Sequence, residues 1–478
     1  MENKEVIELG KLFEKDLNYR GFNLWEMCEG AVFNHFLKEP KKIGFLEKLK
    51  ARLMRPIIIR KDLEREAEMK PEEEVQNTDL LFVAFDVSHV NTFIPIMKNL
   101  DNFKIIRFDS PANELTKETL EKKEIKYMNL DAYMTPEIEK RLREAKKWLA
   151  KAWKKIRQDK ELKEKLGDKY EPGIDTLEYF CATRKRFLEV IRYIELYEEL
   201  FKKVKPKKVL CVDDVNPIGR ILALTAKKNN IPSFVLQHGS LSGNPVGKIV
   251  SDKMIVNGIK DKEFLIQNGA TEEKIVVTGQ PRFDEMATLQ MTREEACKKF
   301  GLDPNKKIIV FAAQKNVAGE NITQSALDLF LKKLDHFDQK KYNFVLKLHP
   351  IQEEKEYKKY GSKVKVMKDE NINEVLLCAD VLLTAFSTVA IESVLLGTPV
   401  VTINLGDDSY IDYSKDNVGF RILKEEDFLP TLRKVLYDEE FKKEFLEAKE
   451  KFIANYNYKL DGKATKRILE ILDREIAQ

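Results

Sequence analysis

Two short apolar runs in the second half of the chain end in residue types that can bind or transfer an anionic group. The run 344–348 is followed by His349-Pro350, and the run 381–384 is followed, after Ala-Phe, by Ser387-Thr388. Both runs are rich in Val and Leu and too short for a helix, which is typical of buried parallel strands. We therefore expect two polar clusters at strand ends of one parallel sheet.

The second cluster stands directly before a helical pattern from Val389 to Leu396, which ends at Gly397. Ser387 or Thr388 in that position would cap the helix, and a capped helix start after a parallel strand is a common phosphate site. Glu392 lies one helical turn further on and could reach the polar part of a bound ligand. The alternative is a purely structural cap with a solvated Glu392.

Further polar clusters follow predicted strands in the first half of the chain. Arg282 could hold a phosphate or carboxylate through two hydrogen bonds, and Gly239 and Gly279 would let the backbone approach a ligand closely. His238 or Asp214 could act as a base toward a hydroxyl group. The clusters are Asp86, Ser88 and His89 after 80–85, Asp213-Asp214 after 208–212, Gln237-His238-Gly239-Ser240 after 233–236, and Gly279 to Asp284 after 275–278.

The alternation of short apolar runs with helical patterns predicts an α/β protein with two doubly wound parallel sheets. We expect a helical extension over 1–78, a first Rossmann-like domain over 79–290 with a helical insertion at about 135–203, and a second one over 291–478. The Asp86 to His89 segment is predicted as a loop, in which His89 either binds a ligand or only starts the next helix. A cleft between the two domains is expected, with the last helix packing back on the first domain.

Composition narrows the class of protein. The chain has 478 residues, 43% hydrophobic and 34% charged, with a net charge of +4, which is typical of a soluble globular protein and gives no reason to expect a nucleic-acid partner. Its five cysteines lack metal-site spacing, so we expect reduced thiols. Motifs for a phosphate loop, a dinucleotide-binding loop or a zinc protease are missing from the sequence. We expect no metal and no cofactor.

Two basic segments leave the question of membrane contact open. Lys38 to Lys61 holds nine Lys or Arg against two Glu, interleaved with apolar residues. It could lie on an anionic membrane surface or pack on its own domain. Residues 139–165 hold twelve basic and five acidic residues. This segment could be a solvated helix, or it could be a platform for an anionic acceptor or lipid headgroups. Because no apolar stretch approaches the roughly 18 residues of a span, we expect a cytoplasmic protein with at most peripheral contact at the inner membrane face.

The ordered set of clusters resembles a group of glycosyltransferases with the GT-B fold. This group contains the CDP-glycerol glycerophosphotransferases of teichoic acid synthesis and the capsule polysaccharide transferases, and the bacterial polysialyltransferases look similar. The resemblance covers roughly residues 205–415. It is carried by Gln237-His238-Gly239, Gly279 to Asp284, Leu348-His349-Pro350, and Ala379-Asp380 with Ser387-Thr388 and Glu392.

The resemblance implies roles for these residues. His349, beside Pro350, would contact the nucleotide, and Ser387 with Thr388 would contact its phosphate. Glu392 would bind the ribose hydroxyls. The resemblance also implies catalysis for His238, with Asp214 as a second candidate whose Asp-Asp-Val sequence lacks the glycine of the polysialyltransferase motif. From their positions after predicted strands, Arg282 is expected to bind phosphate, and Ser88, His89, Gly239 and Ser240 are expected to bind the acceptor.

Together these features predict a metal-independent transferase. It would move a sugar or a polyol phosphate from a nucleotide-activated donor to a surface polysaccharide or lipid-linked glycan. One alternative is a non-hydrolysing nucleotide-sugar 2-epimerase, although such enzymes usually carry His-Val-Glu-Ala-Gly-Leu-Arg where this chain has LQHGSLSG. Another alternative is a nucleotide-binding partner subunit without turnover.

Overall fold

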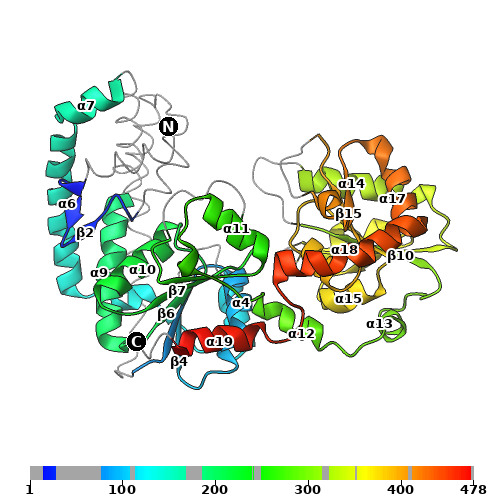
Figure 1. Cartoon of the computed structure of the whole chain (residues 1–478), viewed down its shortest axis with the longest axis horizontal. Helices are drawn as coiled ribbons and strands as arrows, with labels where there is room; N and C mark the ends of the chain where they lie inside the picture. The colour runs from blue at the N-terminus through cyan, green and yellow to red at the C-terminus, as the bar shows by residue number, and fades with distance from the viewer. Residues whose placement is uncertain are drawn as a thin grey trace. The chain divides into compact units, whose positions relative to one another are not determined.

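The computed structural model describes residues 14–27, 77–107, 114–167, 186–239, 241, 249–314, 322–349, 352–406 and 412–474. The chain divides into two compact units, and each unit is built on its own sheet (Figure 1). Unit 1 comprises Met1–Val256, Lys262–Val276 and Ile468–Gln478, and unit 2 comprises Asn257–Asp261 and Val277–Arg467. The basic segment Lys38 to Lys61 lies outside the described residues.

Unit 1 contains a seven-stranded sheet whose strands run in the order β5-β4-β3-β6-β7-β8-β9. Counted along the chain this order is 3-2-1-4-5-6-7, and the pairs from β5 to β8 are parallel. It is the doubly wound order in which the chain turns back between two central strands, here β3 and β6. The strands are β3 (Leu80–Ala84), β4 (Phe103–Arg107), β5 (Met128–Asn129), β6 (Val209–Cys211), β7 (Ser233–Leu236), β8 (Lys253–Val256) and β9 (Ile275–Val277).

Unit 2 contains a six-stranded, wholly parallel sheet in the order β12-β11-β10-β13-β14-β15. The order along the chain is 3-2-1-4-5-6, so its point of reversal lies between β10 and β13. The doubly wound parallel sheets expected from the sequence are therefore confirmed. The strands are β10 (Lys307–Ala312), β11 (Tyr342–Lys347), β12 (Lys365–Met367), β13 (Val381–Thr384), β14 (Val400–Ile403) and β15 (Gly419–Ile422).

Helices follow most strands. In unit 1 they are α4 (Val87–Met97), α5 (Glu114–Lys122), α6 (Pro136–Ile156), α7 (Lys160–Leu166), α9 (Arg186–Val204) and α10 (Pro217–Lys228). In unit 2 they are α12 (Asp284–Ala287), α13 (Arg293–Lys299), α14 (Ile322–Lys333), α15 (Ile372–Cys378), α16 (Val389–Leu395), α17 (Phe428–Tyr437) and α18 (Glu439–Asn457). The division into units passes through α11 (Ile259–Gln267) and α19 (Ala464–Arg474). None of the described helices combines the length and the apolar composition needed to cross a membrane.

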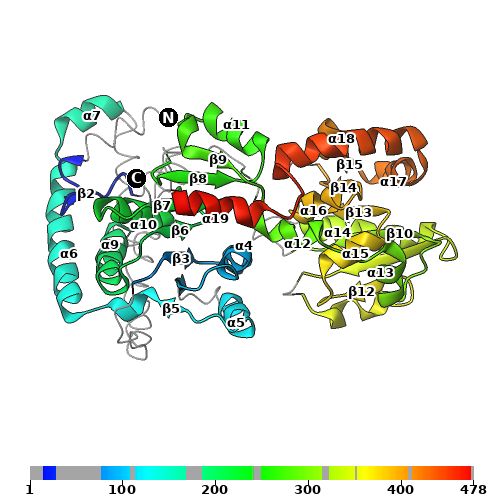
Figure 2. The ribbon, with the colours of Figure 1, turned by 60° about the horizontal axis from the view of Figure 1, so that its bottom comes forward.

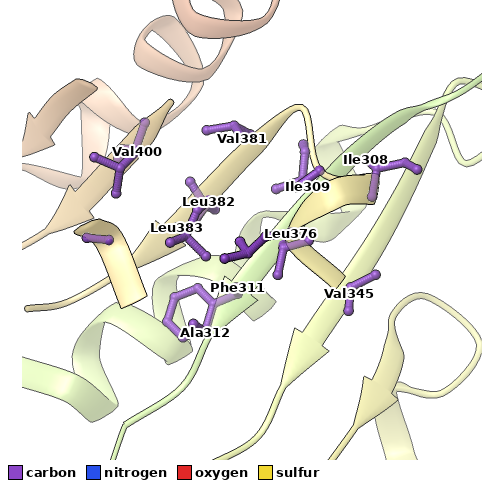
Figure 3. Packing of buried hydrophobic residues seen from close by; sticks show 14 of the residues in the cluster. Ile308, Ile309, Phe311, Ala312, Val345, Leu376, Val381, Leu382, Leu383 and Val400 are labelled. Atoms are coloured by element: carbon purple, nitrogen blue, oxygen red, sulfur yellow. The ribbon is translucent and has the colours of Figure 1, made fainter. Parts of the chain in front are cut away.

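The two sheets form the centres of the two cores. In unit 2 the side chains of Ile309, Phe311 and Leu382 are almost fully buried, and they interlock between neighbouring strands (Figure 3). In unit 1 the last helix, α19, adds Ile468 and Leu472 to the cluster around the central strands (Figure 2). The expectation that the final helix packs on the first sheet is thus confirmed.

Two predicted strands, 233–236 and 381–384, have the bounds expected from the sequence, whereas β12 and β15 of the unit 2 sheet were not predicted. β15 begins at Gly419, which pairs with Val400, and a Cβ atom at Gly419 would lie 2.0 Å from the Val400 carbonyl oxygen. Glycine is a poor strand residue by propensity, but here only glycine fits between the strands. The strand at the far edge of the unit 1 sheet, β5, is short and contains only Met128–Asn129.

The described part of the N-terminal region is a β-hairpin, where the sequence predicted helix. β1 (Asn18–Tyr19) pairs with β2 (Phe22–Asn23) in antiparallel fashion. Arg20 and Gly21 between them both have positive φ, as a two-residue hairpin turn requires. The N–H of Gly21 donates to Oδ1 of Asn18 at 2.9 Å, which closes the turn.

A buried carboxylate fixes this hairpin and α6 to α9. Oε1 of Glu195 accepts hydrogen bonds from the Tyr19 hydroxyl at 2.7 Å and from Nη1 of Arg20 at 2.5 Å, and Oε2 accepts one from Nε of Arg141 at 2.6 Å. Burial alone would raise the pKa of Glu195, but these hydrogen bonds outweigh burial and lower the pKa below its usual value. The ion pairs therefore stabilise the fold above the unfolded-state pKa of a glutamate, and this stabilisation is lost as pH falls through the folded-state pKa.

We predict that Glu195→Gln lowers the free energy of unfolding by about 2 kcal/mol at pH 7. Removing one partner of a fully buried pair costs roughly 3–5 kcal/mol, but the arginines here are partly solvated, so the cost is smaller. Scanning calorimetry should show a fall in melting temperature of several degrees. The difference from wild type should shrink as pH falls through the lowered pKa of Glu195, where the wild-type carboxylate takes up a proton.

Glu199→Gln on the same helix is the control, because the ion-pair partners of Glu199 among the described residues are solvated lysines at 3.8 and 3.9 Å. It should leave the melting temperature within about 1 °C of wild type. Equal melting temperatures for wild type and Glu195→Gln would contradict the role given to this carboxylate.

Candidate functional site

The first polar cluster of unit 1 lies at the start of a helix rather than in a loop. Asp86 is the N-cap of α4, and its side chain accepts a hydrogen bond from the N–H of Ser88 at 2.9 Å. The predicted loop over Asp86 to His89 is therefore wrong, because the Asp side chain caps a helix that begins at Val87. Ser88 and His89 lie in the first helical turn, just past the carboxyl end of the central strand β3.

His89 is held in a fixed orientation under this turn. Its side chain is buried, and Nδ1 accepts a hydrogen bond from the N–H of Phe85 at 3.3 Å. Burial, with the neighbouring His238, lowers the pKa of His89 to about 3, so the ring stays neutral at physiological pH. Because Nδ1 accepts, the proton of the neutral ring is on Nε2.

His238 meets His89 at the carboxyl edge of the unit 1 sheet. The two rings contact each other edge to face, with their centroids 4.6 Å apart. A third ionisable group, Asp213, follows the neighbouring strand and interacts electrostatically with His238. The structure therefore brings together one carboxylate and two histidines from the ends of β3, β6 and β7.

Asp213, to which the sequence analysis gives no role, has one carboxylate oxygen held in place by backbone N–H groups. Its Oδ1 accepts hydrogen bonds from the N–H groups of Val215 at 2.6 Å and Asn216 at 3.1 Å. Burial raises the pKa of this carboxyl group, and the two backbone N–H groups and His238 partly offset that effect. One oxygen is thus fixed by the backbone, which leaves the other for a polar partner.

Asp214 has a structural role, contrary to its selection as a candidate base. Its side chain is buried, and Oδ2 alone accepts three hydrogen bonds, from the N–H of Val250 at 2.9 Å and from the N–H and hydroxyl of Ser251 at 2.9 and 2.8 Å. This carboxylate therefore ties the segment before β8 to the end of β6. The geometry argues against a role for Asp214 in proton transfer.

Gly239 follows His238 in an open position. Nε2 of Gln237 donates to the Gly239 carbonyl oxygen at 2.8 Å, and a Cβ atom at Gly239 would meet no atom within 4 Å. Contacts within the described protein therefore do not require a glycine here. Ser240, the last predicted acceptor residue, lies outside the described residues.

In unit 2, two amide side chains hold the turn between β13 and α16. Oε1 of Gln314, beyond the end of β10, accepts hydrogen bonds from the N–H of Phe386 at 2.9 Å and the hydroxyl of Thr384 at 3.3 Å. Nδ2 of Asn404, beyond the end of β14, donates to the Ala385 carbonyl oxygen at 3.0 Å. The turn is thus clamped from both neighbouring strands at the reversal point of the sheet.

The predicted cap at the start of α16 comes from Ser387. Its Oγ accepts a hydrogen bond from the N–H of Val389 at 3.3 Å. Thr388 occupies the N-cap position, but its helical φ and ψ keep its side chain from making a capping hydrogen bond. Both side chains are half-buried, and both lie at the carboxyl end of β13 as predicted.

Arg282 and Glu392, far apart in the sequence, form an ion pair. Nη2 of Arg282 lies 3.1 Å from Oε1 of Glu392, whose side chain is only 9% exposed. Burial raises the pKa of Glu392, and the arginine partly offsets that effect. Nε of Arg282 is buried without a hydrogen-bond partner among the described residues. The pair therefore keeps unused hydrogen-bonding capacity for a ligand.

Two neighbouring motif residues, Gly279 and Asp284, have structural contacts within unit 2. Gly279 has φ +85°, and a Cβ atom there would lie 2.8 Å from the Asn457 carbonyl oxygen, so packing explains this glycine without a ligand. The Asp284 carboxylate accepts hydrogen bonds from the N–H groups of Ala464 at 2.9 Å and Thr465 at 2.7 Å, at the start of α19.

His349 lies just beyond β11, two strands away from β13 in the same sheet. Its N–H donates to Oε1 of Gln352 at 2.9 Å, and its carbonyl oxygen accepts from the N–H of Gln352 at 2.9 Å. These reciprocal bonds fix the backbone of His349 at the edge where Gln314 and Ser387 also lie. Pro350 is outside the described residues.

In the described part of the chain, no group of side chains is arranged for metal or thiol chemistry. No cluster of three or more His, Cys, Asp or Glu side chains is arranged there to hold a metal ion. The described cysteines Cys211, Cys297 and Cys378 are buried free thiols. Metal independence of the reaction stays a prediction.

The residues that sequence reasoning missed are Asp213, Gln314 and Asn404. Each stands within two residues of the end of β6, β10 or β14, so position along the strand was the available signal. What the sequence lacked was the surroundings of each side chain: Asp214 is hydrogen-bonded to Val250 and Ser251, whereas Asp213 interacts electrostatically with His238.

One family of known proteins matches most of the chain. The family model described as CDP-Glycerol:Poly(glycerophosphate) glycerophosphotransferase matches residues 137–473. That range covers more than half of the chain and contains every predicted site residue except Ser88 and His89.

A curated relative gives a more distant match. The teichoic acid poly(ribitol-phosphate) polymerase of Bacillus spizizenii is 24% identical over 311 residues, which are 62% of this chain and 47% of that protein. The chain therefore spans about half the length of the curated relative it matches.

Solved structures are similar in fold. The UDP-GlcNAc 2-epimerase of Neisseria meningitidis bound to UDP-GlcNAc aligns with a TM-score of 0.56 and 14% identity, over 83% of this chain and 100% of that chain. The wall teichoic acid polymerase TagF aligns with a TM-score of 0.49 and 14% identity, over 91% of this chain and 99% of that chain. The likeness to the epimerase concerns the fold, and together with the two doubly wound sheets it confirms the expected GT-B fold.

We predict that His238→Gln raises the pKa of the Asp213 carboxyl group, because the favourable charge of a protonated His238 is lost. Carbon-13 NMR of aspartate-labelled protein, titrated with acid, measures this pKa. His349→Gln in unit 2 is the matched control and should leave it unchanged. If His238→Gln also leaves it unchanged, the two side chains do not interact as described.

Proposed function

The chain belongs to the CDP-glycerol:poly(glycerophosphate) glycerophosphotransferase family, and from this premise we propose that it transfers a polyol phosphate from a CDP-activated polyol to a cell-wall phosphodiester polymer. Of the two groups that the sequence left open, a sugar and a polyol phosphate, the family favours the second. The curated relative, named as a poly(ribitol-phosphate) polymerase, supports the same class of reaction.

We assign the donor to unit 2. The observation that carries this assignment is the buried Arg282–Glu392 pair, whose 3.1 Å contact leaves Nε of the arginine without a partner. A guanidinium group of this kind suits a diphosphate, because it offers several donors in a rigid plane. Glu392 would accept hydrogen bonds from ribose hydroxyls. The Ser387 and Thr388 hydroxyls and the His349 ring, at the same sheet edge, complete the proposed donor contacts.

We assign activation of the acceptor hydroxyl to unit 1. His238 is the proposed general base, and the Asp213 carboxylate favours the protonated ring that forms when His238 accepts a proton. His89, neutral and fixed by Phe85, would support the His238 ring from the other side. Ser88 and the open Gly239 are the proposed acceptor contacts.

The reaction balances without an external reagent. An acceptor oxygen forms a bond to the phosphorus that carries the polyol, and the bond from this phosphorus to the bridging oxygen of the diphosphate breaks. CMP leaves with the electron pair, and the acceptor proton passes to His238. Arg282 would stabilise the negative charge that develops on the leaving phosphate, an electrostatic contribution of the kind that often dominates catalysis.

The alternative of a nucleotide-sugar 2-epimerase has support from fold alone. The epimerase structures are no more than 16% identical to this chain, and such a likeness does not extend to activity. The proposed transferase requires an acceptor, whereas an epimerase does not. This difference decides the design of the experiment.

We predict CMP release from CDP-glycerol or CDP-ribitol that depends on an added oligomeric polyol-phosphate acceptor, measured by chromatography. His238→Ala should lower the rate about 10²–10⁴-fold, because the general base is lost. His336→Ala is the matched control, since His336 is exposed and lies away from both proposed sites, and it should retain the wild-type rate. A chelator should leave the rate unchanged.

Two results would contradict the proposal. The first is a free epimer formed from UDP-GlcNAc without acceptor, which would make the chain an epimerase. The second is no acceptor-dependent release with either donor, which would favour a binding subunit without turnover. A rate abolished by chelator would overturn metal independence only.

A further inference from the structure

The positive charge of the chain is unevenly distributed. Residues 139–165 hold twelve basic and five acidic residues, a net charge of +7, whereas the whole chain carries +4, so all other residues together carry −3. Most of this segment is α6, a helix of 21 residues in unit 1. A local excess of this size on one helix calls for a physical explanation.

Five of these charges form a single row along the exposed side of α6. The row members follow one another at spacings of three or four residues, so they lie on one face of the helix, and all five are exposed. The row extends about 21 Å, with a cation at nearly every turn. We call it the α6 basic row: Lys140, Arg143, Lys147, Lys151 and Lys154.

The row is electrostatically unfavourable in the free protein. Like charges three or four residues apart destabilise a helix by roughly 0.2–0.5 kcal/mol per pair. In the part of the chain that the structure describes, the ion pair recorded for the row joins Arg143 to Glu139 at 3.5 Å, and both side chains are at least half exposed. Such a solvated pair offsets little of the repulsion, and the exposed Glu144, four residues from Lys140 and three from Lys147, offsets only part of it because five cations share the face. A polyanion would relieve it.

The opposite side of α6 fixes the row in place. Ile138, Ala145 and Ala152 are buried on that side, and Arg141 is bound to the buried Glu195 at 2.6 Å. Figures 1 and 2 both show α9 between α6 and the sheet of unit 1. The row is therefore presented on a packed helix, which lowers the entropy cost of binding.

The composition of the exposed face argues against a membrane and against nucleic acid. A helix that lies in a membrane interface inserts large apolar side chains, and α6 has no exposed large hydrophobic residue. Surfaces for single-stranded nucleic acid add aromatic side chains on which bases stack. Trp148 instead packs against Tyr19, with ring centroids 5.9 Å apart. A linear polyanion without bases fits the row best.

We propose that the α6 basic row binds a polyol-phosphate chain, the acceptor and product of the proposed reaction, at a position separate from the reacting hydroxyl. This inference rests on the proposed function, which makes such a chain the substrate. Binding is through charge alone, with release of the counterions that the phosphates hold, so it must weaken steeply with salt.

Fluorescence anisotropy with labelled inorganic polyphosphate tests the row without requiring turnover. The variant Lys147→Gln/Lys151→Gln/Lys154→Gln should bind at least tenfold more weakly than wild type. The slope of log affinity against log salt should fall by about 2, because three phosphate contacts are lost. The matched control Lys340→Gln/Lys443→Gln/Lys451→Gln removes the same charge from exposed positions in unit 2 and should bind as wild type.

Wild-type affinity in the α6 variant, or equal loss in both variants, would overturn the proposal. Stronger binding of wild type to phosphatidylglycerol vesicles than to polyphosphate, lost in the α6 variant, would overturn it in favour of a membrane surface. His238→Ala separates the two proposals. It should abolish transfer and still bind polyphosphate, so a failure of the row and a failure of the proposed reaction give different results.

Discussion

The burial of both parallel sheets determines where chemistry can be placed in this protein. Central strands such as β10 and β13 are apolar and covered, and a charge in their middle would lose its hydration without a partner. Polar side chains can leave such a sheet only at its edges. They gather at the carboxyl edge, where the strand order turns back between β3 and β6 and between β10 and β13.

Two buried glutamates, Glu195 and Glu392, differ in how completely the protein compensates their negative charge. Glu195 has three hydrogen-bond donors within 2.7 Å, and its pKa is lowered, so its charge is fully satisfied by the protein. Glu392 has a guanidinium group at 3.1 Å, and burial raises its pKa, so its charge is only partly compensated. An incompletely satisfied buried carboxylate is costly for stability and is therefore a better candidate for ligand binding.

The sheets could be predicted because their strands are short apolar runs with polar ends. Ser233–Leu236 and Val381–Thr384 have the expected bounds for this reason. β15 could not be predicted, because it begins with a glycine, which is a poor strand residue by propensity. The close contact with Val400 that requires this glycine is present only in the folded sheet. The helix at Asp86 began earlier than expected, because a capping side chain was interpreted as part of a loop.

The site was predictable in position but not in its contacts. Strand ends identified His238 and Ser387, and Glu392 follows Ser387 in the first turns of α16. The choice between Asp213 and Asp214 depended on side-chain direction, and the partners that settle it, Val250 and Ser251, are distant in sequence. Hydrogen bonds between residues so far apart in the sequence depend on the fold and cannot be predicted from a local sequence pattern.

We propose that unit 2 holds the nucleotide while unit 1 activates the acceptor. Calorimetric titration of CDP, with UDP and GDP for comparison, into wild type, Arg282→Gln and His238→Ala tests this division directly. The account predicts that CDP binds wild type and His238→Ala with equal affinity, and Arg282→Gln about tenfold more weakly, or about 1.4 kcal/mol. Unchanged CDP affinity in Arg282→Gln, with loss in His238→Ala, would contradict it.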